Sequence, residues 1–182
     1  MFNKDMKSGC ILITGGAKSG KSRIALNFCN SFDKKKLFLA TAQAFDDEME
    51  IRIQRHKEER GRQGWETVEE PLDVSKAIKK IDQEGTILLF DCFTLWLNNL
   101  YMKYDQDQDS IDKAIENFLN QLKQVKGIIV VVSNEVGMGI VPDNALSRRY
   151  RDDAGSANQR IAQISNKVVA VISGLPLVLK DQ

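Results

Sequence analysis

A glycine-rich stretch near the start of the chain, residues 15–22, constrains the fold more than any other feature. It reads Gly-Gly-Ala-Lys-Ser-Gly-Lys-Ser and follows an apolar run at residues 10–13. This is the pattern of a phosphate-binding loop, in which glycines let the backbone curl so that several N–H groups point at one anion. Such a loop requires a strand before it and a helix after it, and the flanking residues have both patterns. The stretch therefore predicts an α/β protein that binds a nucleoside triphosphate.

Particular side chains of this loop have expected roles. A helix that begins near Gly20 adds the positive end of its dipole, and Lys21 reaches the terminal phosphates. The hydroxyl of Ser22 is expected to ligate Mg²⁺. A second apolar run, Thr86–Asp91, ends in an acid. Because P-loop proteins place a carboxylate beside the Mg²⁺-bound phosphates at such a strand end, Asp91 is predicted to be the second metal residue.

Composition limits the class of protein. The 182 residues, with no linker-like stretch, suit a single domain over 1–182. A formal net charge of +1 does not favour nucleic acid or an anionic membrane as a partner. No apolar run approaches the roughly 20 residues that span a bilayer, so an integral membrane protein is not expected. The cysteines at positions 10, 29 and 92 are widely spaced and odd in number, which favours reduced thiols and a cytoplasmic location over a disulfide framework or zinc site.

Hydrophobic periodicity predicts alternating strands and helices, hence a mostly parallel sheet with helices on both faces. The strands are expected at 10–14, 37–40, 65–68, 86–91, 127–133, 167–173 and 175–179. The helices are expected at 22–30, 46–62, 72–81, 94–104, 111–122 and 144–165, with Pro71 in the first turn of its helix and a loop at 105–109. The last strand is expected to be an antiparallel edge. The wide apolar surface of 94–104 is consistent with core packing or with a subunit contact.

His56 is the only histidine of the chain. On a helix, Arg52 and Arg60 would lie one turn to either side of it. One interpretation is a solvated helix with an incidental histidine. The other is a nucleophile among cations that hold a triphosphate. Spacing alone leaves both open.

The segment after the strand 127–133 offers a place for a second substrate. Residues 134–142 contain two glycines and a proline, which indicates a shaped loop at the same sheet edge as the phosphate-binding loop. Arg148, Arg149 and Arg151 follow closely. They either form a solvated face or neutralise a transferring phosphoryl group or a substrate phosphate.

Together these features resemble the bifunctional adenosylcobinamide kinase/adenosylcobinamide-phosphate guanylyltransferase family of cobalamin biosynthesis, over nearly the whole chain. The matching stretches are 14–22, 40–42, 46–49, 52–56, 65–71 and 133–142. The histidine segment and Asn-Glu-Val-Gly-Met-Gly-Ile-Val-Pro at 134–142 are specific to the family, whereas the phosphate-binding loop is generic. The chain departs from the family at Lys18, where arginine is frequent, and at Gly61, where proline is frequent.

The resemblance implies a RecA-like P-loop fold, a trimer and a two-step reaction. In the first step adenosylcobinamide is phosphorylated with ATP or GTP. In the second, GMP from GTP is transferred through a guanylylated His56 to give adenosyl-GDP-cobinamide, with Lys21 also catalytic. The family positions that contact the nucleotide match Gly15, Gly16, Ala17, Lys18, Ser19, Gly20, Lys21, Ser22, Ala40, Thr41, Ala42, Lys57, Glu58, Glu59, Arg60, Glu69 and Asp91.

Two other functions are compatible with the phosphate-binding loop. The first is a P-loop small-molecule kinase without nucleotidyl transfer, in which the arginines at 148, 149 and 151 hold the acceptor. The second is a GTP-dependent binding switch. The chain has no Asn-Lys-x-Asp motif after a strand, which disfavours the switch.

Overall fold

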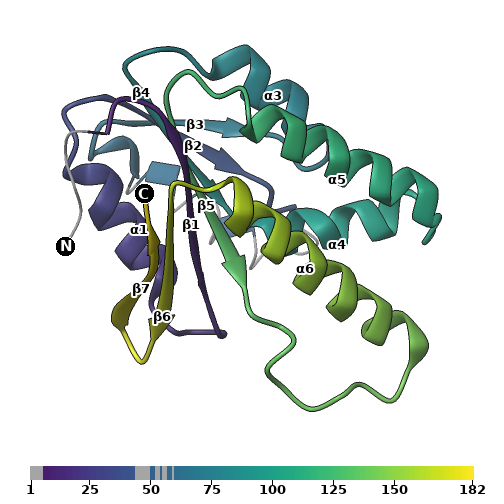
Figure 1. Cartoon of the computed structure of the whole chain (residues 1–182). Helices are drawn as coiled ribbons and strands as arrows, with labels where there is room; N and C mark the ends of the chain where they lie inside the picture. Colours follow the sequence, from purple (N-terminus) through teal and green to yellow (C-terminus); the bar gives the residue numbers. More distant parts are fainter. Residues whose placement is uncertain (1–5, 44–49, 52–53, 55–56, 59) are drawn as a thin grey trace.

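The strands of this protein form a mostly parallel sheet, as the sequence predicts. The structure, a computed structural model, describes residues 6–43, 50–51, 54, 57–58 and 60–182. The described residues form a seven-stranded sheet in the order β3-β2-β4-β5-β1-β6-β7 (Figure 1). Its strands are β1 (Gly9–Gly15), β2 (Lys35–Ala40), β3 (Trp65–Glu69), β4 (Thr86–Asp91), β5 (Ile128–Asn134), β6 (Lys167–Ile172) and β7 (Leu175–Asp181). All neighbouring pairs are parallel except β6 and β7, which confirms the antiparallel edge.

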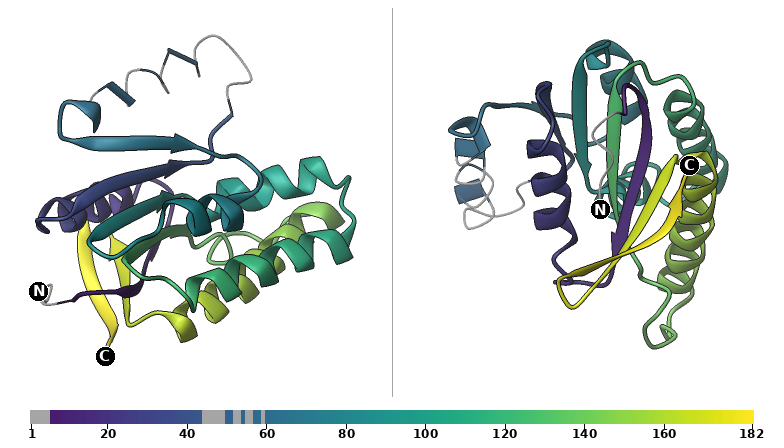
Figure 2. Two further views of the ribbon diagram at one scale, coloured as in Figure 1. Left: turned by 90° about the horizontal axis from the view of Figure 1, so that it is seen from above. Right: turned by 60° about the vertical axis from the view of Figure 1, so that its left-hand side comes forward.

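Helices cover both faces of the sheet. The described helices are α1 (Lys21–Asn30), α3 (Val74–Ile81), α4 (Phe93–Lys103), α5 (Gln108–Leu122) and α6 (Ala145–Ile164). Figure 2 shows α1 on one side of the sheet and α5 and α6 on the other. Residues of β1 alternate between the two sides: Ile11 and Ile13 pack with the α1 residues, whereas Leu12 packs with α3–α6. Burial of both faces explains why these strands are continuously apolar.

The apolar surface of α4 belongs to the core. Trp96 is 1% exposed and packs against Phe93 and Phe118, with ring centroids 5.6 and 5.2 Å away. Its indole N–H donates to the Leu72 carbonyl at 2.8 Å, so the polar atom of this buried ring is satisfied. Between the two alternatives left open by the sequence, the structure therefore supports core packing within one chain.

Two predicted boundaries were wrong because side chains cap the backbone there. The helix expected to begin at 72 begins at Val74, so Pro71 is not in its first turn. The Glu70 carboxylate accepts the N–H groups of Leu72 and Asp73 at 3.0 and 2.8 Å and holds these residues in a turn. The loop expected at 105–109 ends earlier, because Asp107 caps α5 by accepting the Ser110 N–H at 3.2 Å.

Within the described part of the chain, every helix is too short or too polar to cross a lipid bilayer.

Candidate nucleotide-binding site

The phosphate-binding loop connects the carboxyl end of β1 to the first turn of α1. The Ser19 N–H donates to the Gly16 carbonyl at 3.2 Å, which closes the turn. The ammonium of Lys21, 8% exposed, donates to the same carbonyl at 3.1 Å and so lies over the loop. The Ser19 hydroxyl is buried and has no hydrogen-bond partner among the described residues. A phosphate oxygen is the kind of partner that this arrangement fits.

Two glycines of the loop, Gly15 and Gly20, are required by the structure around them. A side chain at Gly15 would place its Cβ 2.4 Å from the Val171 carbonyl oxygen of β6. Gly20 has a φ of 94° and is the N-cap of α1, where no side chain caps the helix. The first N–H groups of α1 are therefore left for an anion. The turn between β6 and β7 supports the loop, since the Gly174 N–H donates to the Ser19 carbonyl at 2.8 Å.

Asp91 at the end of β4 meets Ser22 at the start of α1. The Ser22 hydroxyl donates a hydrogen bond to the Asp91 carboxylate. Burial raises the pKa of Asp91, and this shift is opposed by the Ser22 hydrogen bond and by the positive charges of Lys21 and Arg60. A hydroxyl and a carboxylate oxygen at one point are hard donors that suit Mg²⁺. The structure thus brings together the two residues predicted to hold the metal.

The other predicted nucleotide residues lie along the same edge of the sheet. Asp91, Ala40 and Glu69 are level with one another across β4, β2 and β3. After β2, Thr41 is buried and its carbonyl accepts the Asn99 side-chain amide at 2.8 Å, which fixes the start of the loop that contains Ala42.

The segment after residue 56 contacts this edge through two basic side chains. The Lys57 ammonium lies 2.6 Å from the Glu69 carboxylate. The Arg60 guanidinium carbon lies 3.8 Å from the centre of the Phe38 ring. Glu58 is exposed and accepts the Gln54 amide at 3.2 Å, and no described contact links it to the phosphate-binding loop. His56 and Glu59, like Arg52, lie outside the described residues.

A polar network at the ends of β1 and β5 was not predicted. The Thr14 hydroxyl donates to the Glu135 carboxylate at 2.5 Å, and the Asn158 amide of α6 approaches the same oxygen at 3.4 Å. The Ser133 hydroxyl donates to the side-chain amide oxygen of Asn158 at 2.6 Å. The signal was visible as two apolar strands that each end in polar residues, because parallel strand ends meet at one edge.

The loop between β5 and α6 extends beyond this edge (Figure 1). Met138 and Ile140 are 87% and 97% exposed. One of the three predicted arginines holds the loop: Arg148 donates to the Pro142 and Asp143 carbonyls at 3.0 and 2.7 Å. Another, Arg151, pairs with the adjacent Asp152 at 3.0 Å. The third, Arg149, is exposed on α6.

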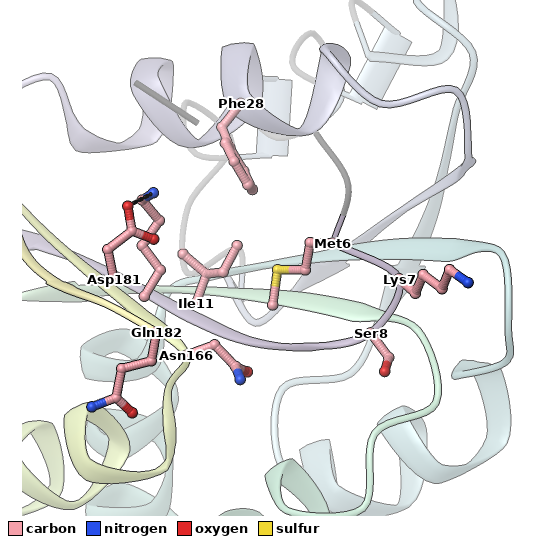
Figure 3. Close-up of a pocket in the computed structure, with 9 residues that line it drawn as sticks. Met6, Lys7, Ser8, Ile11, Phe28, Asn166, Asp181 and Gln182 are labelled. Atoms are coloured by element: carbon pink, nitrogen blue, oxygen red, sulfur yellow. Dashed lines mark hydrogen bonds and ion pairs between the residues drawn. The ribbon is translucent and has the colours of Figure 1, made fainter. Parts of the chain in front are cut away.

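A pocket of about 360 Å³ lies at the amino ends of β1 and β6. Figure 3 shows the residues that line it. It is lined by residues before β1, including Met6 and Ser8, and by Asn166 before β6. The Lys167 and Asp181 side chains at one wall pair at 2.7 Å. The phosphate-binding loop follows the carboxyl end of β1, so this pocket is separate from it.

The fold and the site define a P-loop protein that binds a nucleoside triphosphate. Solved structures have the same fold. A KaiC-like protein from Pyrococcus horikoshii matches with a TM-score of 0.53 at 15% identity, over 90% of this chain and 71% of that one. A type III secretion system ATPase from pathogenic bacteria matches with a TM-score of 0.59 at 10% identity, over 94% of this chain and 57% of that one. This P-loop NTPase fold confirms the predicted fold class.

Sequence comparison identifies the family within this class. The family model described as cobinamide kinase / cobinamide phosphate guanyltransferase matches residues 11–179. The bifunctional adenosylcobalamin biosynthesis protein CobP of Pseudomonas aeruginosa is 42% identical over 171 residues, which cover 94% of this chain and 97% of the relative. CobU of Escherichia coli, which has the same description, is 36% identical over 181 residues, covering 93% and 99%. The chain belongs to this family, and its activity is that of a cobinamide kinase and cobinamide phosphate guanylyltransferase of cobalamin biosynthesis.

The family assignment decides between the functions that the phosphate-binding loop left open. It confirms the predicted resemblance and the two transferase activities. A kinase without nucleotidyl transfer and a GTP-dependent binding switch are therefore set aside.

Proposed function

We propose that the guanylyl transfer proceeds through a covalent GMP adduct on His56. The observation that carries this proposal is the anchoring of the neighbouring residues: Lys57 pairs with Glu69, and the Arg60 charge acts on Asp91. Residues one and four positions after the histidine thus contact the edge that holds the phosphate-binding loop. An unperturbed imidazole is mostly neutral near pH 7 and can act as a nucleophile.

The proposed transfer has two steps. An imidazole nitrogen of His56 attacks the α-phosphorus of GTP, the bond to the β-phosphate oxygen breaks, and pyrophosphate leaves. The phosphate of adenosylcobinamide phosphate then attacks the α-phosphorus of the adduct, and the nitrogen–phosphorus bond breaks to give the GDP-linked product. Two displacements replace one difficult transfer.

In the kinase step, ATP or GTP would be held by residues 15–22, with Lys21 at the terminal phosphates. Ser22 and Asp91 are the residues that fit Mg²⁺, which supplies neutralisation of phosphate charge when bound. Lys21 contributes a second positive charge from within the loop. The remaining nucleotide contacts would come from Ala40–Ala42, residues 57–60, and Glu69.

We further infer the organisation of the protein. One domain, 1–182, would carry both steps, and a cytoplasmic location is supported by its free cysteines. We propose a homotrimer, supported by an apolar face of the β6–β7 hairpin. Ile172, Leu175 and Leu177 share this face and are 63%, 72% and 54% exposed. A second copy of the chain is the occupant that would bury it.

The covalent adduct is tested with GTP radiolabelled at the α-phosphorus. The wild-type protein should acquire a label that is acid-labile and alkali-stable, as a phosphoramidate is. His56→Ala should acquire none, yet should still phosphorylate adenosylcobinamide. Lys21→Ala should lose both reactions by at least about 100-fold, because its charge serves the nucleotide in each.

Lys79→Ala, which changes an exposed lysine of α3, is the matched control and should behave as wild type. Undiminished label on His56→Ala would refute the histidine adduct. Loss of both activities in His56→Ala would show instead that this residue orders the common nucleotide site.

A further inference from the structure

The kinase step requires a proton acceptor that the family assignment does not identify. The cobinamide hydroxyl must lose its proton as its oxygen bonds to the γ-phosphorus. Strands β3 and β4 place three carboxylates near the sheet edge, and each is engaged: Asp91 accepts from Ser22, Glu69 pairs with Lys57, and Glu70 accepts backbone N–H groups. Among the described residues, a carboxylate with a free oxygen therefore has to come from the strands nearer to the phosphate-binding loop.

Glu135 occupies such a position. It follows β5, the strand between β1 and β4, and hence lies between the phosphate-binding loop and the strand of Asp91. In the parallel register Asn134 is level with Gly15, the first residue of the loop. The Glu135 N–H donates to the Gly15 carbonyl at 3.1 Å, which ties the two backbones together. This backbone position is next to the place where terminal phosphates bind.

The Glu135 side chain is held by one oxygen and open at the other. Oε1 accepts from the Thr14 hydroxyl and the Asn158 amide, at 2.5 and 3.4 Å. Both donors are neutral, so they orient the carboxylate without neutralising its charge. Oε2 has no hydrogen-bond partner among the described residues, and the side chain is only half-buried. A carboxylate that is oriented through one oxygen and has no partner at the other is able to accept a proton as a general base.

The same residue begins the loop that leads to the exposed Met138 and Ile140. These two side chains give the loop an exposed apolar surface within five positions of Glu135, which suits the apolar part of an acceptor.

We propose that Glu135 is the general base of the kinase step. Its free carboxylate oxygen takes the proton of the cobinamide hydroxyl while the hydroxyl oxygen forms a bond to the γ-phosphorus. The bond between the γ-phosphorus and the β,γ-bridging oxygen breaks, and the nucleoside diphosphate leaves. The protonated carboxyl returns its proton to solvent. The proposal rests on the kinase activity and is independent of the His56 adduct.

The test is Glu135→Gln, with the two activities measured separately. An amide oxygen still accepts from Thr14 and Asn158, so the structural contacts remain while the base is lost. We expect the rate of adenosylcobinamide phosphorylation to fall by about 10²–10⁴-fold, the usual contribution of a general base. Guanylyl transfer to supplied adenosylcobinamide phosphate should stay within about threefold, because that nucleophile is already an anion at neutral pH.

Glu116→Gln is the matched control, since this exposed glutamate of α5 pairs with Arg160 far from the loop. It should leave both activities unchanged. Glu135→Asp, which keeps the carboxylate one methylene further back, should retain more kinase activity than Glu135→Gln and guards against a folding defect in the amide variant. Kinase activity retained in Glu135→Gln, or equal losses of both activities in a variant that melts like wild type, would overturn the proposal.

Discussion

At the scale of single residues, Asp91 is expected to bind Mg²⁺, and its position lowers the stability of the folded protein. Its side chain is half-buried at the end of β4, and the partial loss of solvent there raises its pKa above the usual value of 3.8. Between that value and the higher pKa of the folded state, the folded protein binds more protons than the unfolded chain. The free energy of unfolding therefore falls as pH rises through this window. The Ser22 hydroxyl and the positive charges of Lys21 and Arg60 offset part of the cost.

Replacing this carboxylate should separate stability from activity. Asp91→Asn should unfold at a higher temperature than wild type at pH 7 without metal, and the difference should shrink as pH falls toward 3.8. The Mg²⁺ concentration needed for half-maximal kinase activity should rise at least about tenfold. Thermal unfolding against pH and Mg²⁺ titration of the kinase measure the two effects.

Asp33→Asn, at an exposed position, is the control and should change neither quantity. An Asp91→Asn variant with normal Mg²⁺ dependence would contradict the assignment of Asp91 as a metal residue.

At the scale of elements, the phosphate-binding loop depends on strands distant in sequence. Gly15 lies against the Val171 carbonyl of β6, and the Ser19 carbonyl accepts the Gly174 N–H from the β6–β7 turn. The C-terminal hairpin therefore supports a loop that is formed near the N-terminus. This contact gives the first glycine a structural reason besides the approach of a phosphate.

The close approach at Gly15 can be tested by stability alone. Gly15→Ala would force its Cβ to within 2.4 Å of the Val171 oxygen, so β1 and β6 must separate. We expect a loss of about 1–3 kcal/mol in the free energy of unfolding, measured by urea denaturation.

The matched substitution is Gly155→Ala in α6, where an added Cβ meets nothing within 4 Å. It should stabilise the protein by about 0.5–1 kcal/mol, because alanine has the higher helix propensity. Equal stability of Gly15→Ala and wild type would show that the strands adjust without cost.

At the scale of the whole molecule, the β6–β7 hairpin is the element expected to join subunits. Leu177→Lys places a charge in the centre of the apolar face, where burial against a second copy would cost several kcal/mol. We therefore expect this variant to elute as a monomer, while the wild type has the mass of a trimer by light scattering.

Met102→Lys changes an apolar side chain that is even more exposed, 75%, at the end of α4, and should leave the mass unchanged. A wild type that is monomeric, or a Leu177→Lys variant that remains trimeric, would exclude this face as the trimer contact.

The order of strands and helices was predictable because continuous apolar runs and helical periodicity are local. The wrong boundaries, at residues 72 and 108, arise where Glu70 and Asp107 accept backbone N–H groups. These three hydrogen bonds depend on side-chain orientation, which hydrophobic periodicity does not report. The role of His56 stays a prediction.

The polar network around Glu135 was not predicted from the sequence, for a different reason. Thr14 and Glu135 are 121 positions apart in the chain, and Ser133 and Asn158 are 25 apart. Neither pair forms a recognisable short pattern. Thr14 meets Glu135 because β5 lies beside β1, and Ser133 meets Asn158 because α6 packs near the end of β5.

The sequence by itself determined the phosphate-binding loop, the parallel βα pattern and the family of this protein, because each is written in contiguous residues. The tertiary structure decided which side chains share the edge of the sheet. The order β4-β5-β1 brings Asp91 to Ser22 and sets Glu135 beside Gly15. Local patterns are the same for any order of parallel strands, whereas the distance between two strand ends depends on that order alone.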